Sequence, residues 1–373
     1  MVSTIVRKWL TEGSAAFADL GTFLPLAIGL IMLGGVSPIG LLYGFGIFAL
    51  VTALFYRRPI PIQPMKATAA MGIAGLIGPD VLAATGILLG ITLILLAQTN
   101  TIDWIKSQIP KTVLHGMRAA LAITLIVNAL GMGNISLMAV ALLLALLIGL
   151  QYTPLRPVGL LLVLVVGWIV LGQSVEFVES NALIALPALN LPSLASYGSA
   201  LELSFLPQLA LTLTNALILT AVIAQEYFPG DAKPVTEKRL AFTSGIANIV
   251  LAPIGAIPMC HGAGGLSAHF AQGSRTGWSI AIFGLVCLLL AALMGPQAVA
   301  ILAAIPLEVV VVLVLYAAWH LADPVQLKAI KPSKVLIVIS MTLIALWGGL
   351  LASLIFGVAL VSISRAQRRF ASS

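Results

Sequence analysis

The sequence predicts an all-α polytopic membrane protein with fourteen transmembrane segments, arranged as a 7+7 inverted repeat that contains two broken half-helices. Three features predict this: long apolar runs, basic residues confined to alternate connections, and two matching proline-rich interruptions. Of the 373 residues, 60% are hydrophobic and 8% are charged, and the mean hydropathy is +1.12. Soluble domains carry about 25% charged residues, so this composition indicates a chain embedded in lipid.

The apolar runs set the segment boundaries, because a spanning helix needs about 20 apolar residues and a half-helix needs fewer. Arg7 and Lys8 precede the first run as in a signal peptide. However, Asp19 and Pro25 interrupt that run, so it is interpreted as the first span. The first set is predicted at roughly 14–33, 38–56, 64–78, 81–98, 112–131, 136–151 and 155–172. The second set is predicted at roughly 205–225, 236–253, 260–271, 275–294, 305–321, 334–348 and 350–364.

An odd number of spans in each set inverts the second set relative to the first. The final pair depends on a tight turn at Trp347-Gly348-Gly349-Leu350. The alternative is one long tilted helix, because tilt absorbs a length mismatch with the bilayer.

Charge placement supports this count. The net charge is +7, but the basic residues are spread between apolar runs rather than gathered in a patch for nucleic acid. With the N-terminus inside, the predicted cytoplasmic connections hold all the basic clusters, and the predicted outer loops near 79–80, 132–135, 173–203, 252–256, 295–304 and 349 hold no Lys or Arg. The positive-inside rule therefore places both termini in the cytoplasm. The expected location is the plasma (inner) membrane. The apolar outer stretch Leu186–Pro192 is expected on the membrane surface or over the first half.

Two short segments interrupt apolar sequence with prolines and then continue in small residues. They are Pro61–Thr68 and Ile257–Gly265, and they share a Pro-Met pair at positions 194 residues apart. Such paired breaks in two halves are the best sequence pointer to a transporter's binding site. Irregular backbone survives in lipid only where protein buries it or it lines a cavity. Each break therefore predicts a half-helix whose N-terminal N–H groups and positive dipole end face an anion.

Two charged residues lie inside the predicted membrane region. Lys66 begins the first half-helix, whereas the other basic residues lie in or near cytoplasmic connections. Asp19 lies within the first span and must be neutral, paired or hydrated. Lys66 is interpreted as a cation beside the anion site, and the alternatives are snorkelling or a structural pair with Asp19. Asp19 is a candidate for the coupling proton.

His261 begins the second half-helix, opposite Lys66 in this prediction, and is followed by Gly262-Ala263-Gly264-Gly265. Those glycines would let backbone N–H groups approach an oxyanion closely. Close helix packing is the alternative, and a satisfied buried histidine is the alternative for His261. Cys260, His261 and His269 lack a fourth ligand, so no metal site is predicted. Thr212, Thr214 and Asn215 in the eighth span are polar at mid-membrane depth, where they suit either an oxyanion or helix–helix hydrogen bonding.

At these residues the chain resembles the molybdate transporter family, which is related to the sulfate permeases of the SulP/SLC26-like superfamily. The resemblance rests on Phe17–Pro25, Pro61–Ala67, Pro258–Gly265 and Gly273–Gly277. It implies the seven-plus-seven fold of sulfate permeases, bicarbonate carriers and nucleobase permeases, with a core that slides against a gate like an elevator. Sulfate permeases typically end in a STAS domain, and its absence after Arg369 favours the molybdate branch.

The resemblance also divides the chain. It implies a core domain at 1–100 and 204–295, a gate domain at 101–175 and 296–373, and an extracytoplasmic loop at 176–203. It places the substrate site on Gln63, Lys66, Ala67, His261, Gly262, Gly264 and Asn215. The remaining predicted binding residues are Met65, Thr68, Cys260, Ala263 and Gly265 in the same two segments, with Thr22, Phe23 and Thr214 on neighbouring spans.

The sequence therefore predicts a secondary active transporter of a tetrahedral oxyanion, with molybdate first and sulfate or tungstate as alternatives. Asp19 and His261 are the candidate proton-coupling groups, so a proton is the expected co-substrate, although the sequence leaves the coupling ion open. A nucleobase carrier is disfavoured because spans 8 and 10 lack the carboxylates that grip a base. An anion channel is the alternative from another class. No catalytic set has credible spacing, so neither an enzyme nor a cofactor is expected. Membrane lipids are expected partners, and a homodimer is left open.

Overall fold

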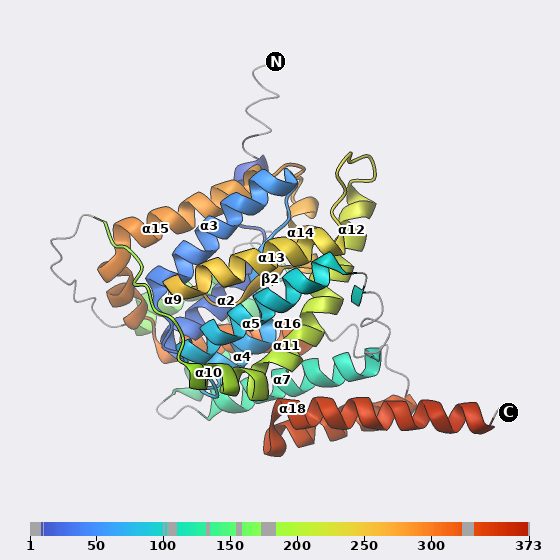
Figure 1. The fold of residues 1–373 in the computed structure, drawn as a ribbon. Coiled ribbons are helices and arrows are strands. Elements are labelled where there is room, and N and C mark those ends of the chain that lie inside the picture. The colour runs from blue at the N-terminus through green and yellow to red at the C-terminus, as the bar shows by residue number, and fades with distance from the viewer. Residues whose placement is uncertain are drawn as a thin grey trace.

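The computed structural model describes residues 9, 11–99, 101–102, 110–131, 135–153, 159–172, 184–322 and 332–371, and the statements below concern these residues. The fold is helical apart from one pair of short strands (Figure 1). The first half contains α2 (Leu20–Met32), α3 (Pro38–Tyr56), β1 (Ile62–Pro64), α4 (Lys66–Ile73), α5 (Pro79–Gln98), α7 (Lys111–Leu130), α8 (Leu137–Leu150) and α9 (Gly159–Leu171). The second half begins with α10 (Leu194–Ala200), η2 (Leu201–Phe205), α11 (Leu206–Leu211), η3 (Thr212–Leu219) and α12 (Thr220–Tyr227). It continues with α13 (Glu237–Leu251), η4 (Ala252–Ile254), β2 (Met259–His261), α14 (Ala263–Ala271), α15 (Trp278–Ala303), α16 (Leu307–Ala322) and α18 (Pro332–Ala371).

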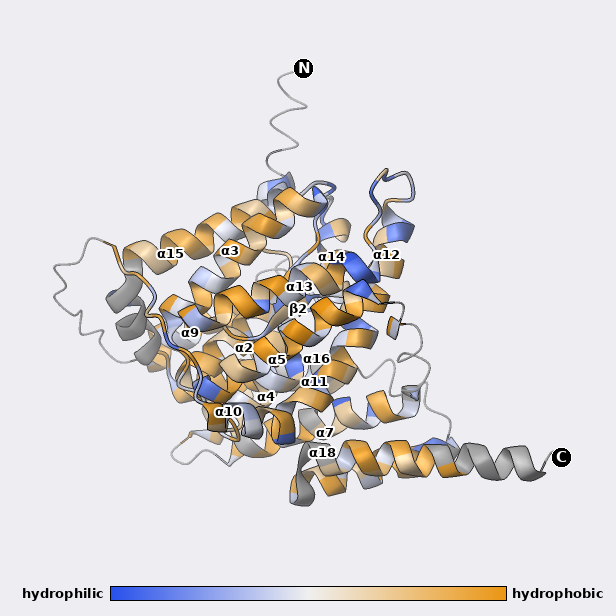
Figure 2. Ribbon diagram, in the orientation of Figure 1, coloured by the Kyte–Doolittle hydropathy of each residue, from blue (hydrophilic) through white to orange (hydrophobic). Residues whose placement is uncertain are grey.

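Hydrophobic residues predominate along most of these helices (Figure 2). Within the described residues, three helical stretches are long and apolar enough to cross a membrane: Pro38–Tyr56, Pro79–Gln98 and Leu194–Tyr227. Shorter apolar helices of 10–17 residues include Leu20–Met32, Leu137–Leu150 and Leu307–Tyr316. The chain is thus a multi-pass membrane protein, whereas the count of fourteen spans stays a prediction.

Helices from the two halves pack in matching pairs. α3 packs along α15, and α5 packs along α13. Each pair meets through glycines: a Cβ on Gly46 would lie 2.9 Å from the carbonyl oxygen of Gly284, and one on Gly90 would lie 2.7 Å from that of Gly245. Small residues let membrane helices approach closely. α7 packs instead against α16 and α18, so the described helices gather into two groups that meet where α16 crosses α2.

Three connections that carry basic residues lie together at one end of the molecule. Arg58 forms a salt bridge with Asp231, and its Nη1 also donates a hydrogen bond of 2.9 Å to the carbonyl oxygen of Arg275. The hydrogen bonds from Arg58 hold the pKa of Asp231 below its usual range. Glu12 binds the same region, because its carboxylate accepts hydrogen bonds from Ser274 and Thr276. Connections predicted to share one side of the membrane therefore meet.

The other end is covered by the extended segment 184–193. The backbone N–H of Ala185 donates to the carbonyl oxygen of Ala292 on α15, and Tyr43 on α3 donates to the Ala185 carbonyl oxygen. Asn190 N–H donates to the carbonyl oxygen of Pro253. Leucines along the segment remain exposed, with Leu189 78% exposed. The segment thus contacts both halves, and its exposed apolar side chains suit a membrane surface.

The C-terminal helix α18 doubles back on itself. Helical conformation is assigned over all 40 residues, yet the Ser353 hydroxyl donates a 2.8 Å hydrogen bond to the carbonyl oxygen of Met341. Twelve residues of straight helix would separate these groups by about 18 Å. Met341 also packs in one cluster with Val361. The two arms therefore lie side by side, as a reversal near Trp347–Leu350 requires (Figure 1).

Two boundaries predicted from the sequence are wrong. The eighth segment was expected at 205–225, but helix runs continuously from Leu194 to Tyr227. The region 295–304 was expected to be an outer loop, whereas α15 continues to Ala303. Half of the residues in Ala298–Ala303 are alanine, the strongest helix former, and this favours continuation of the helix.

Candidate functional site

The two proline-rich segments meet as paired strands at the centre of the molecule. β1 and β2 are antiparallel, with Gln63 opposite Cys260 and Pro64 opposite Met259. The N–H of Met65 donates a further hydrogen bond of 2.9 Å to the carbonyl oxygen of Pro258. The residue before a proline is pushed towards extended backbone, which explains why these proline-rich stretches form strands rather than continue a helix. Each strand leads directly into a short helix, β1 into α4 and β2 into α14.

The N-terminus of α4 holds a side-chain oxygen that the sequence did not predict. Gln208 Oε1, from α11, accepts hydrogen bonds from the N–H groups of Ala67 at 2.8 Å and Thr68 at 3.2 Å. Its Nε2 donates to Thr212 Oγ1 at 2.9 Å. The amide orientation follows from chemistry, because two N–H donors require the acceptor end of the amide. Gln208 thus satisfies groups that a helix N-terminus leaves open, since Met65 supplies no side-chain cap.

The N-terminus of α14 faces a carboxylate. A Cβ built on Gly265, in the first turn, would collide with the carboxylate of Asp19 and lie 2.8 Å from Pro61 Cγ. A Cβ on Gly262 would collide with the side-chain amide of Gln63. Gln63 Nε2 in turn donates a 2.5 Å hydrogen bond to Asp19 Oδ2. A negative group is stabilised at a helix N-terminus by the macrodipole, so Asp19 lies where an anion is favoured.

The remaining glycine of this turn behaves differently. Gly264 is exposed, and a Cβ there would meet no heavy atom within 4 Å. Gly265 is therefore the glycine that allows close approach at α14, while Gly264 borders open space. Ala263 is buried at 2% exposure and begins the helix.

The two N-termini have a crossed arrangement. Asp19, which precedes α2 in the first half, lies against α14 of the second half. Gln208, on α11 in the second half, caps α4 of the first half. Each half-helix thus faces an oxygen from an early segment of the other half.

Lys66 is the first residue of α4 and is partly exposed. It lies within electrostatic range of both Asp19 and Cys260. The cation therefore lies near residues of both halves, where it can compensate the Asp19 carboxylate and draw a second anion. Both interpretations from the sequence, an anion-site cation and a partner of Asp19, are compatible with this position.

His261 does not lie opposite Lys66 as the sequence suggested. Antiparallel pairing places it opposite Ile62, at the far end of the two strands from Lys66. Its Nδ1 lies 3.1 Å from the carbonyl oxygen of Pro61, and its Nε2 lies 2.9 Å from Thr243 Oγ1. A carbonyl only accepts, so Nδ1 carries the proton and Nε2 accepts from the Thr243 hydroxyl. With both nitrogens bonded, this is the arrangement of a structural histidine.

The predicted residues on neighbouring spans lie in varied positions. Thr22 hydrogen-bonds the Asp19 carboxylate, whereas Phe23 packs edge-to-face on Phe45 with ring centroids 4.7 Å apart. Thr214 donates back to the Ala210 carbonyl oxygen at 2.9 Å. Both Thr214 and Asn215 lie in the π-helical turn η3, a feature that often marks functional sites.

Sequence reasoning missed Gln208 and underrated Thr212, which lies 4.0 Å from Met65 Sδ. Their spacing of four residues on one apolar helix was the available signal, because side chains at i and i+4 share a face. Among the described residues no group of three His, Cys, Asp or Glu could hold a metal ion.

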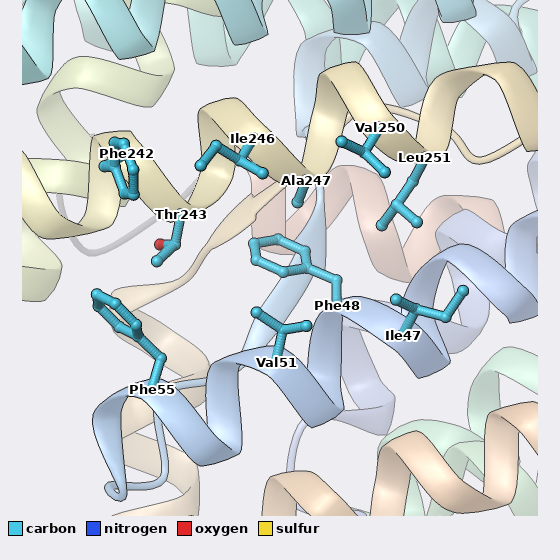
Figure 3. Close-up of a pocket in the computed structure, with 10 residues that line it drawn as sticks. All are labelled: Ile47, Phe48, Val51, Phe55, Phe242, Thr243, Ile246, Ala247, Val250 and Leu251. Carbon is cyan, nitrogen blue, oxygen red and sulfur yellow. The ribbon is translucent and has the colours of Figure 1, made fainter.

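An open groove near these elements does not suit an anion. It lies between α3 and α13, has a volume of about 280 Å³ and is lined by apolar side chains, apart from Thr243 (Figure 3). Phe55 and Phe242 face each other at one end, and Ile47 and Leu251 lie at the other. An ionised dianion loses its hydration in such surroundings without gaining donors. The groove therefore belongs to the lipid-facing surface.

This geometry defines a multi-pass membrane protein whose two interrupted segments present paired helix N-termini. Its fold is similar to that of the transmembrane domain of the cyanobacterial bicarbonate transporter BicA, with a TM-score of 0.69 at 18% identity, covering 94% of this chain and 98% of that one. It is also similar to SLC26A9, with a TM-score of 0.68 at 12% identity, covering 96% of this chain and 65% of that one.

The sequence supplies the family. A family model described as "Molybdate transporter of MFS superfamily" matches residues 11–125 and 200–321, so the chain belongs to the molybdate transporter family. Although this description names the MFS superfamily, the fold is similar to those of BicA and SLC26A9. Molybdate transporter 2 of Arabidopsis thaliana is 25% identical over 374 residues, covering 84% of this chain and 78% of the relative. Molybdate transporter 1 of the same plant is 24% identical over 375 residues, covering 85% of this chain and 80% of the relative. These relatives are transporters, not enzymes.

Proposed function

We propose that this protein is a secondary active transporter of a tetrahedral oxyanion, with molybdate as the preferred substrate and sulfate or tungstate as competitors. The group containing α2–α5 and α10–α15 is the core that carries the anion. It slides like an elevator against α7–α9, α16 and α18 in the cell membrane, with both termini in the cytoplasm. Family membership and the BicA-like fold support this proposal.

The observation that carries the proposal is the pair of half-helix N-termini joined by β1 and β2. Each already faces a side-chain oxygen, Gln208 Oε1 at α4 and an Asp19 carboxylate oxygen near α14. Oxyanion oxygens have the same requirement for N–H donors and positive dipole ends. The bound dianion takes the hydrogen bonds that Gln208 accepts at α4 in its absence, and it lies near the first turn of α14, with Lys66 as the nearby cation.

Uptake of a dianion needs a driving force. Moving each negative charge inward against a negative-inside potential costs about 2.3 kcal/mol per 100 mV. Co-transported protons supply compensating positive charge. Asp19 is the carboxylate nearest α14, and protonation removes its charge from the position that the anion prefers. Protonation of Asp19 and binding of the dianion therefore favour each other.

Proteoliposomes test this function. Uptake of labelled molybdate should saturate, accelerate when unlabelled molybdate is present on the far side, and rise with an inward proton gradient. Asp19→Asn should remove the gradient response and keep exchange of anion across the membrane. Uptake that follows a sodium gradient and ignores protons contradicts the coupling, and unitary currents would indicate a channel instead.

A further inference from the structure

A small cavity lies beside Asp19. Asp19, Pro61 and His269 form part of its wall, and the other lining residues are apolar: Ala16, Leu20, Phe23, Ile62, Ile280 and Phe283. Its volume is about 20 Å³. A cavity needs roughly 10–15 Å³ on this measure to hold one water molecule, so there is room for one.

His269 gives this cavity its chemistry. The side chain is 2% exposed, and its Nδ1 has no hydrogen-bond partner among the described residues. A buried polar atom without a partner destabilises the fold. The other titratable side chain in the cavity wall is Asp19. A water between the two would satisfy Nδ1 and hydrate the carboxylate.

His269 also lies on the way to the end of the molecule where the basic connections meet. Its carbonyl oxygen accepts from the N–H of Ser274 at 3.0 Å, and the Ser274 hydroxyl donates to Glu12 at 2.7 Å. The charged groups around this route are Glu12, which acts electrostatically on His269, and Arg275, which stacks on Phe270. Asp19, across the cavity, is itself acted on by Lys66.

We propose that one water in this cavity links His269 Nδ1 to Asp19, and that His269 passes the coupling proton between Asp19 and the Glu12 end of the molecule. Protonated Asp19 gives its proton to the water, while the water gives one of its own protons to Nδ1. The Asp19 O–H bond breaks, an N–H bond forms, and the water is regenerated. The imidazolium then loses its Nε2 proton towards the Glu12 carboxylate, which acts electrostatically on His269. This inference rests on the proton coupling of the proposed function.

The test compares His269→Asn with wild type in proteoliposomes at a fixed molybdate concentration. Asparagine places an amide near the position of Nδ1, so it can hold the water, but it does not titrate. Two rates are measured: uptake driven by an inward proton gradient, and exchange of labelled molybdate at equal pH. The gradient-driven rate should fall at least tenfold while exchange changes less than twofold. A full gradient response in His269→Asn overturns the inference.

A second variant leaves the titratable groups in place. Ala16 lines the same cavity and is 3% exposed, so Ala16→Leu would fill the space of the water. It should lose the gradient response as His269→Asn does, and an unchanged response overturns the inference even if His269→Asn fails to fold. A wild type that exchanges molybdate but ignores the gradient instead overturns the coupling on which the inference rests.

Discussion

Gln63 Nε2 donates a hydrogen bond of 2.5 Å to Asp19 Oδ2, and this bond ties strand β1 to the residue that precedes α2. The same Gln63 amide fills the space that a side chain at position 262 would occupy. One glutamine therefore positions the Asp19 carboxylate against the first turn of α14. Gln208 performs the corresponding task at α4 by accepting from two backbone N–H groups.

Two substitutions of Gln208 test the effect of charge and the effect of hydrogen bonding separately. Gln208→Glu keeps an acceptor for Ala67 and Thr68 but adds a negative charge where the dianion must bind. We expect molybdate affinity to fall at least tenfold, about 1.4 kcal/mol, with little change in melting temperature. Gln208→Leu instead leaves two buried donors without a partner and should cost roughly 1–3 kcal/mol of stability. Calorimetry and thermal unfolding of both variants give the two readouts; equal affinity of wild type and Gln208→Glu would argue against a site at α4.

Lys66→Met keeps most of the length of the side chain and removes its charge. Loss of a cation near the site should weaken dianion binding more than it changes expression or melting temperature. Lys66→Arg is the matched control, because it keeps the charge. Normal binding by Lys66→Met with a lowered melting temperature would instead make Lys66 a structural partner of Asp19.

The loop network around Glu12 predicts a pH dependence of stability. Burial raises the pKa of Glu12, but hydrogen bonds from Ser274, Thr276 and the N–H of Arg275 outweigh it, and the net result is a lowered pKa. A lowered folded-state pKa means that ionised Glu12 stabilises the fold above its usual value of 4.5, and that this stability is lost as the pH falls through the folded-state value.

The corresponding measurement is thermal unfolding of wild type and Glu12→Gln in detergent between neutral and acidic pH. At neutral pH the variant should be less stable by roughly 1.5–3 kcal/mol, the value of hydrogen bonds to a charged group. That difference should shrink as the pH falls. A difference that stays constant across this range would show that the Glu12 charge does not stabilise the loops.

The sequence predicted that the two Pro-Met segments interrupt helix at matching places, because proline and glycine act on the local backbone. It did not predict that the two segments pair as strands. The spacing of Gln208 and Thr212 indicates only a shared helix face. The role of Gln208 depends on α4 approaching from another part of the chain, which the local sequence does not encode. The π-helical turn at Thr212–Leu219 has no sequence signature either.

His261, in contrast, was suggested by the sequence as a site residue, and the structure gives it a different position. A histidine next to glycines at a helix start suggested a ligand-binding group, but the antiparallel register turns it towards Thr243 and Pro61. Register between two segments nearly 200 residues apart is set by tertiary packing, which the local sequence does not encode. The division into a moving core and a gate likewise stays a prediction, because one conformation contains no displacement.

The central claim is that the anion binds between the N-termini of α4 and α14. Calorimetric titration of molybdate into purified wild type, Gly265→Val and Gly264→Ala tests it most directly. Valine at 265 would collide with the Asp19 carboxylate and Pro61, whereas a Cβ at 264 meets nothing within 4 Å. We expect at least a tenfold loss of affinity for Gly265→Val, about 1.4 kcal/mol, and a change below threefold for Gly264→Ala. Wild-type affinity in a folded Gly265→Val protein would contradict the claim.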